Sequence, residues 1–124
     1  MRKRVLIVDD EENVLKLISA TLGYDKRYEL TLAHDGEEAL DIAFRERPDL
    51  VILDMLMPKL DGSAVCRALK SDPSTAHVKV ICLTALTQES ERQKVIRAGA
   101  DHFLTKPFSP MALLLEVERL LNGD

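Results

Sequence analysis

The stretch Leu50-Val51-Ile52-Leu53-Asp54 places four consecutive apolar residues directly before a carboxylate. Such a run, which is β-branched at Val51 and Ile52, is typical of a short strand that is buried on both faces. An aspartate at the end of a buried strand costs free energy unless its charge has partners. We therefore expect Asp54 to lie where the strand emerges, beside groups that compensate its charge.

Three other apolar runs in the chain also end in polar side chains. These runs are 5–8, before Asp9 and Asp10; 80–83, before Thr84; and 102–105, before Lys106. A further segment, 29–33, alternates polar and apolar residues, which fits an edge strand that is covered less completely.

Helical patterns fill the intervals between these strands. Three of the helices have N-cap candidates in Asp35, Asp61 and Ser109, and Thr87 is the candidate for a fourth. The helix after Thr87 is mostly polar, so we expect it to be thinly anchored. The apolar positions of this helix are Val95, Ile96 and Ala98. The helix after Asp35 is expected to turn four apolar residues toward the sheet: Ala39, Leu40, Ala43 and Phe44.

Strands that alternate with helices form a parallel sheet with right-handed crossovers and helices on both faces. The sequence therefore predicts a single doubly wound α/β domain of five strand–helix units. Parallel strands all end on one edge of the sheet, and ligands of such sheets bind there, where the strand order reverses. If the first strand is central, the reversal falls between the first and third strands. The side chains gathered at this edge are Asp9, Asp10, Asp54, Thr84 and Lys106.

Composition narrows the class of protein further. The 124 residues carry 17 basic and 21 acidic side chains, a net charge of −4, which argues against a general binder of nucleic acids or membrane surfaces. Cys66 and Cys82 lie inside apolar patterns, as small core residues in a reducing compartment do. No apolar run approaches the roughly 20 residues of a membrane span, so we expect a soluble, cytoplasmic protein.

The chemistry open to this edge follows from its charges. Three neighbouring carboxylates repel one another, and either protonation or a cation relieves the repulsion. Oxygen ligands select a hard ion, best Mg²⁺, and a metal that keeps open water positions suits phosphoryl transfer. Lys106 adds a positive charge and Thr84 a hydroxyl donor. Asp54, alone at the end of its strand, is the best placed to act as a nucleophile that forms an aspartyl phosphate.

Taken together, these residues resemble the receiver domain of two-component response regulators, in particular the chemotaxis regulators. The resemblance spans residues 1–124 and implies a flavodoxin-like fold with strand order 2-1-3-4-5. The motifs that carry it are Val8-Asp9-Asp10, Leu53-Asp54-Met55-Leu56-Met57-Pro58 with Asp61-Gly62, Leu83-Thr84-Ala85, and Ala98-Gly99-Ala100-Asp101 leading to Lys106-Pro107-Phe108.

The resemblance implies that Asp54 accepts a phosphoryl group from a phosphohistidine on a sensor histidine kinase or a phosphotransfer protein. It also implies that Asp10 and Asp54 ligate Mg²⁺ directly, with Mn²⁺ as a substitute. The backbone carbonyl of Leu56 would be a further ligand, and Asp9 would act mostly through water.

The remaining implied roles concern the phosphorylated state. Lys106 would pair with the phosphoryl group, the Thr84 hydroxyl and the Ala85 backbone would contact it, and Phe103 would turn inward in concert. Family members often carry Tyr at this last position, whereas Phe103 has no hydroxyl to present at the surface. The bond between Lys106 and Pro107 would be cis.

The same resemblance implies a switch rather than an enzyme, one that catalyses only its own Mg²⁺-dependent phosphorylation and slow autodephosphorylation. Leu56 and Leu86 stand where rapidly dephosphorylating members tend to have polar groups, which predicts a long-lived phosphoryl state. We expect the helix at 87–98, the fifth strand and the last helix to form the face for a downstream protein partner or a phosphorylation-linked dimer. We expect no output domain within these 124 residues, and both a stand-alone regulator and a domain of a larger protein stay open.

Three other functions compete with this interpretation. A haloacid-dehalogenase-like phosphatase also uses an aspartate nucleophile with Mg²⁺, but it needs an acid where Leu56 stands. A flavodoxin-type cofactor binder needs a phosphate-binding loop after the first strand, where this chain is acidic. An unphosphorylated interaction module would not need the full set of acids, hydroxyl and amine. Singly, each motif also has an ordinary structural reading: a solvated acidic turn, a strand-end threonine, a surface lysine or a core phenylalanine.

Overall fold

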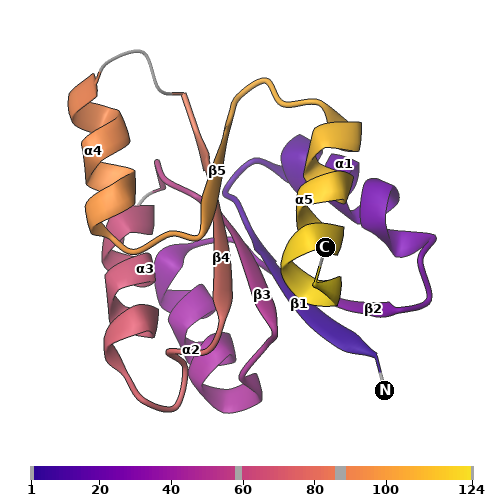
Figure 1. Ribbon diagram of the computed structural model, residues 1–124, viewed down its shortest axis with the longest axis horizontal. Helices are drawn as coiled ribbons and strands as arrows, with labels where there is room; N and C mark the ends of the chain where they lie inside the picture. Colours follow the sequence, from indigo (N-terminus) through magenta and orange to yellow (C-terminus); the bar gives the residue numbers. More distant parts are fainter. Residues whose placement is uncertain (1, 58–59, 86–88, 124) are drawn as a thin grey trace.

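The computed structural model describes residues 2–57, 60–85 and 89–123, and strands alternate with helices throughout (Figure 1). This is the predicted order of five strand–helix units. The elements are β1 Lys3–Val8, α1 Glu12–Gly23, β2 Tyr28–Ala33, α2 Gly36–Glu46, β3 Leu50–Asp54, α3 Gly62–Ser71, β4 Lys79–Thr84, α4 Glu89–Arg97, β5 His102–Thr105 and α5 Pro110–Asn122.

The five strands form one parallel sheet in the order β2-β1-β3-β4-β5. Helices α2, α3 and α4 cover one face of this sheet, and α1 and α5 cover the other (Figure 1). The strand order reverses between β1 and β3, because the chain leaves β1 toward the β2 edge and returns to continue from β3 toward β5. The predicted fold, strand order and central position of the first strand are thereby confirmed.

Two apolar cores lie on the two faces of the sheet. Every residue of β3 is buried, and its side chains alternate between the cores: Val51 and Leu53 pack under α2, α3 and α4, and the other two apolar residues pack under α1 and α5. Cys66 and Cys82 are free thiols buried in the first of these cores, as expected for small core residues. Strand β3 is therefore held from both sides up to the point where Asp54 emerges.

Side-chain caps fix the starts of three helices. Asp35, Asp61 and Ser109 each accept a hydrogen bond from the backbone amide three residues later, so these three predicted N-caps are confirmed. Thr87, the fourth candidate, lies outside the described residues. None of the described helices has the length and apolar character needed to cross a bilayer.

The inner face of α2 differs in one residue from the expectation. Ala39 and Ala43 are buried and Leu40 is half-buried, but Phe44 is 37% exposed and Ile42 takes its place against the sheet. The reason is geometric: Ala39, Ile42 and Ala43 are spaced three and four residues apart and share a helix face, whereas Phe44 lies a further 100° around.

Candidate functional site

The carboxyl ends of β1 and β3 lie side by side, because these strands pair in register from Val5 with Leu50 to Val8 with Leu53. Asp9 follows β1 directly and Asp54 is the last residue of β3. Their side chains therefore meet at the edge of the sheet where the strand order reverses, which is where open parallel sheets bind ligands.

Three carboxylates form the acidic centre of this edge. One oxygen from each of Asp9, Asp10 and Asp54 lies within 4.8 Å of the others. Asp9 is fully buried and Asp54 is 3% exposed, whereas Asp10 is open to solvent. The cluster thus combines two desolvated acids with one that faces water.

Lys106 brings an amine into the same cluster from the turn after β5. Its Nζ donates a hydrogen bond to Asp9 Oδ2 at 3.0 Å and forms ion pairs with Asp54 Oδ2 at 3.4 Å and Glu11 Oε1 at 3.5 Å. Burial lowers the pKa of Lys106, but the bond to Asp9 and the charges of Asp54, Asp9 and Glu11 raise it above its ordinary value. The amine is therefore charged and neutralises part of the acidic cluster.

Asp54 remains under-compensated despite this amine. Burial raises the pKa of its carboxyl to about 6, and the charge of Asp9 acts in the same direction. The Leu56 backbone N–H, which donates to Asp54 Oδ1 at 3.2 Å, and the charge of Lys106 oppose that rise. The resemblance implied a role for the carbonyl of Leu56, but nothing in the sequence indicated this N–H contact.

The donor set fits a hard divalent cation. Carboxylate oxygens with neighbouring backbone carbonyls, on a partly solvated rim, are ligands that Mg²⁺ accepts while it keeps bound water. A cation here would offset the charge of Asp9, which adds to burial in raising the pKa of Asp54. Asp9, Asp10 and Asp54 are thus brought together as the sequence predicted, and their acidic centre is suited to Mg²⁺.

The other predicted residues surround this centre. Thr84 is buried at the end of β4, and its carbonyl accepts a 2.7 Å hydrogen bond from the Lys106 backbone N–H. Ala85 is exposed directly after it. The peptide bond from Lys106 to Pro107 is cis. Phe103 is half-buried in β5 and packs against the core under α2, α3 and α4.

The two leucines of the lifetime prediction can be placed only in part. Leu56 is 70% exposed and lies immediately beside the Asp54 carboxylate through its N–H. Leu86 lies outside the described residues. Leu56 is therefore an exposed apolar residue whose backbone contacts the acidic cluster.

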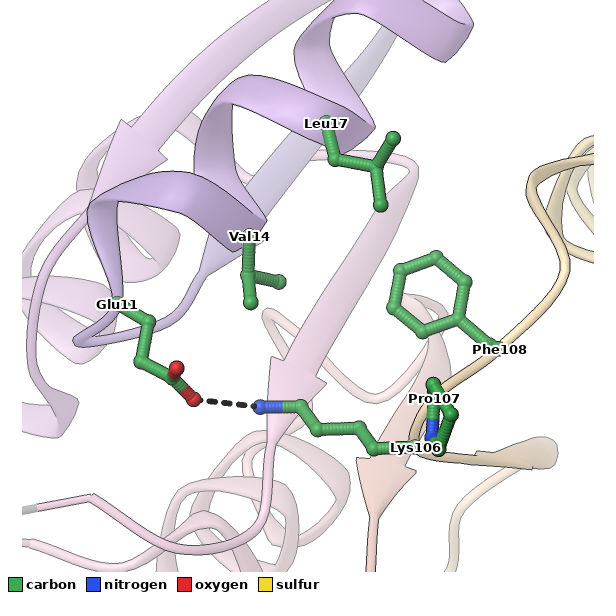
Figure 2. A pocket seen from close by; sticks show the side chains of 6 residues that line it. All are labelled: Glu11, Val14, Leu17, Lys106, Pro107 and Phe108. Atoms are coloured by element: carbon green, nitrogen blue, oxygen red, sulfur yellow. Dashed lines mark hydrogen bonds and ion pairs between the residues drawn. The ribbon is translucent and has the colours of Figure 1, made fainter.

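A pocket of about 330 Å³ adjoins the cluster between the start of α1 and the turn before α5 (Figure 2). Figure 2 shows Glu11 and Lys106 bridging its rim by their ion pair, with apolar side chains around the rest. The sequence analysis predicted neither this pocket nor the ion pair of Glu11 with Lys106. The acidic turn after β1, which contains Glu11, was the only signal for that ion pair. The lining residues are Glu11, Val14, Leu17, Lys106, Pro107 and Phe108.

A flavodoxin-like sheet with three carboxylates and a lysine at its switch point defines a class of small phosphoryl-accepting signalling domains. The chain belongs to the response regulator receiver domain family, whose model matches residues 5–118.

Individual relatives agree with this assignment. The chain is 42% identical over 120 residues, 97% of its length, to Response regulator PleD from Caulobacter vibrioides. A putative response regulator from Chloroflexus aurantiacus superposes with a TM-score of 0.91 at 34% identity, covering 98% of this chain and 99% of that one. The chemotaxis protein CheY4 of Vibrio cholerae gives 0.89 at 33% identity, covering 98% and 100%.

The chain spans about a quarter of the length of PleD and about half of several related transcriptional regulators. It is a receiver domain of two-component response regulators, a signalling switch rather than a classical enzyme. Receiver domains generally use Mg²⁺ and interact with histidine kinases or phosphotransfer proteins.

Proposed function

We propose that Asp54 is the phosphoacceptor of this receiver domain and takes its phosphoryl group from a phosphohistidine on a sensor histidine kinase or phosphotransfer protein. The observation that carries the proposal is the convergence of three carboxylates and the Lys106 amine on one rim, with Lys106 Nζ 3.4 Å from Asp54 Oδ2. In the transfer, an Asp54 oxygen bonds to phosphorus as the phosphorus–nitrogen bond to the imidazole breaks.

Mg²⁺ belongs to the same proposal. Asp10, Asp54 and the backbone carbonyl of Leu56 would hold it, with Asp9 acting mostly through water, and Mn²⁺ would substitute. When bound, the ion neutralises phosphoryl oxygens and removes the repulsion among the carboxylates. The protein supplies the fixed orientation of the acids, since Asp9 also accepts hydrogen bonds from the Glu11 N–H at 2.9 Å and from Lys106.

The other site residues act on the transferred group. Lys106, which pairs with carboxylate oxygens in the structure, pairs with a phosphoryl oxygen once Asp54 is modified. The Thr84 hydroxyl and the Ala85 backbone N–H donate to the other oxygens, and Phe103 turns inward as Thr84 moves. The domain catalyses only its own phosphorylation and slow autodephosphorylation, with Leu56 shielding the acyl phosphate from water.

The output surface of the proposal is the α4-β5-α5 face, which comprises α4, β5 and α5. Among the described side chains of its helices, three large apolar ones are exposed: Ile96 at 51%, Met111 at 61% and Leu115 at 59%. Exposed apolar side chains of this size suit contact with a protein. We assign this face to a downstream protein partner or a phosphorylation-linked dimer, and we assign no direct contact with nucleic acid.

The test is intact-mass measurement of the protein incubated with a small acyl phosphate or phosphoramidate and Mg²⁺. The wild-type chain is expected to gain one phosphoryl group, and to gain none when Mg²⁺ is chelated beforehand. Asp54→Ala is expected to gain none under either condition. Asp41→Ala is the matched control, because Asp41 is an exposed α2 carboxylate that forms an ion pair with Arg45 of the same helix. Equal modification of Asp54→Ala and wild type would overturn the assignment.

A further inference from the structure

Gly36, the first residue of α2, lies against the loop that follows the phosphoacceptor. A methyl group at position 36 would overlap the carbonyl oxygen of Leu60 and would lie 2.8 Å from its Cβ and 3.1 Å from its carbonyl carbon. Backbone atoms cannot swing aside as the end of a long side chain can. Only a residue without a Cβ therefore allows α2 to approach this loop so closely.

Gly62, the first residue of α3, meets the same loop from its other end. A methyl group there would overlap the carbonyl oxygen of Asp54 and lie 2.6 Å from the Cα of Met55. The Gly62 N–H also donates a 3.1 Å hydrogen bond to the Met55 carbonyl, which closes the base of the loop. The loop is thus fixed against the strand that carries Asp54.

These two contacts enclose the residue proposed as a metal ligand. The described part of the loop, 55–57 and 60–61, carries Leu56 between the Gly62 contact at one end and the Gly36 contact at the other. Helices α2 and α3 pack side by side on one face of the sheet (Figure 1), so neither can retreat from the loop without losing its own packing. Leu60 lies two residues before Gly62, and the Gly62 N–H bonds the Met55 carbonyl, so a shift of Leu60 would act on Leu56 through Gly62 and Met55.

We propose that Gly36 is a positioning residue for the metal site: the absence of a side chain there lets the start of α2 hold the β3–α3 loop so that Leu56 keeps its carbonyl in place for Mg²⁺. This rests on the proposed function, in which Leu56 and Asp54 are ligands. Gly36 touches no ligand itself and acts through Leu60.

Gly23 offers a matched control for the test. Both glycines are helical, but a methyl group at position 23 would meet nothing within 4 Å. Alanine is the better helix former at either position, so propensity alone would stabilise both variants. Only the contact with Leu60 distinguishes them.

The experiment compares wild type, Gly36→Ala and Gly23→Ala by calorimetric titration with Mg²⁺ and by the rate of phosphorylation from an acyl phosphate at increasing Mg²⁺. Gly36→Ala is expected to weaken Mg²⁺ binding about tenfold, as loss of a supporting contact around a metal site does, with the rate recovering at high Mg²⁺. Gly23→Ala is expected to match wild type. Unfolding by urea without Mg²⁺ measures stability separately, because a purely structural role would lower stability and leave the affinity for Mg²⁺ unchanged.

A folded Gly36→Ala variant with wild-type affinity for Mg²⁺ would overturn the proposal. If that variant does not fold, Leu60→Gly decides, since glycine loosens the backbone at the residue that the Gly36 contact holds in place. Weakened Mg²⁺ binding in Leu60→Gly supports the role of the contact, and wild-type binding overturns it. Failure of the wild type to bind Mg²⁺ or to be modified at Asp54 would instead overturn the proposed function, and the positioning role with it.

Discussion

At the scale of single residues, Asp54 and Leu56 show how the site combines reactivity with protection. Asp54 is almost fully buried and is contacted by a backbone N–H and an amine, whereas Leu56 places an exposed apolar side chain two residues later. Hydrolysis of an acyl phosphate needs a water molecule in line with the phosphorus. An apolar side chain at this rim offers that water no hydrogen-bond partner.

We therefore predict that Leu56→Asn shortens the lifetime of the phosphorylated protein. A polar group that orients water should accelerate hydrolysis about tenfold, which corresponds to a barrier lower by about 1.4 kcal/mol. Decay of the phosphorylated mass at neutral pH, after removal of the phosphodonor, measures the rate. Leu115→Asn is the matched control, since Leu115 is similarly exposed, at 59%, but lies on α5. Decay of the wild type within seconds would contradict the shielding role.

At the scale of elements, α4 is the helix with the least apolar anchoring among the described residues. Of its expected apolar positions, Val95 is buried but Ile96 is 51% exposed, and Ala98 is buried just beyond the helix end. The Arg92 guanidinium lies 5.6 Å from the ring centre of Phe103 and links α4 to β5. Few buried contacts leave α4 the element that a new charge at the sheet edge displaces at least cost.

The weak anchoring of α4 predicts which elements change on phosphorylation. Amide hydrogen exchange in α4 and β5 should change when Mg²⁺ and beryllium fluoride, a phosphoryl mimic, are added. Exchange in β1 and β3 should stay slow, because both strands are buried in the centre of the sheet. Mass spectrometry of peptides from α4 provides the measurement, with Asp54→Ala as the control that should not respond. Unchanged amide hydrogen exchange in α4 of the wild type would contradict the assignment of the output face.

At the scale of the whole molecule, the acidic site opposes folding in the metal-free protein. The pKa of Asp54 is about 6 in the folded state, against about 3.9 for an unperturbed aspartate. Between these pH values the folded state holds a proton that the unfolded state has released. The contribution of Asp54 to stability is therefore most favourable near pH 4, falls as the pH rises to about 6, and is level above that.

Asp54→Asn should remove this dependence. We predict that the variant is more stable than wild type at pH 7 without metal, by on the order of 2 kcal/mol, and that the gain disappears near pH 4. Urea unfolding in the presence of a chelator measures the difference. The free energy of unfolding of the wild type is subtracted from that of the variant, because other carboxyl groups also make stability depend on pH. Hydrogen bonds lower the pKa values of Asp25, Asp61 and Asp72, so their contribution to stability rises with pH. A gain that is equal at both pH values would contradict the prediction.

The sequence predicts most of the fold because each element carries its own signal. Apolar runs such as 50–53 and caps such as Asp35 and Asp61 locate the strands and helices, and parallel strands must end on one edge. The juxtaposition of Asp9 with Asp54 follows from that topology. Phe44 was placed wrongly because helical phase decides between neighbouring apolar residues, and sequence reveals that phase only approximately.

Contacts between segments far apart in the chain were beyond prediction. The ion pair of Glu11 with Lys106 depends on where two turns meet, and the approach of Gly36 to Leu60 depends on the separation of α2 from the β3–α3 loop. Neither leaves a pattern in composition or periodicity. Such details require coordinates, even where the family and its motifs are plain.

The placement of Lys106 also bears on what happens when magnesium is scarce. Its ammonium group stands among the acids of β1 and β3 and offsets part of their charge. The acids are thus held together by an amine of the chain itself. Under the proposed function, shortage of the ion would therefore stop phosphorylation while this ion-pair network still joins the two strand ends.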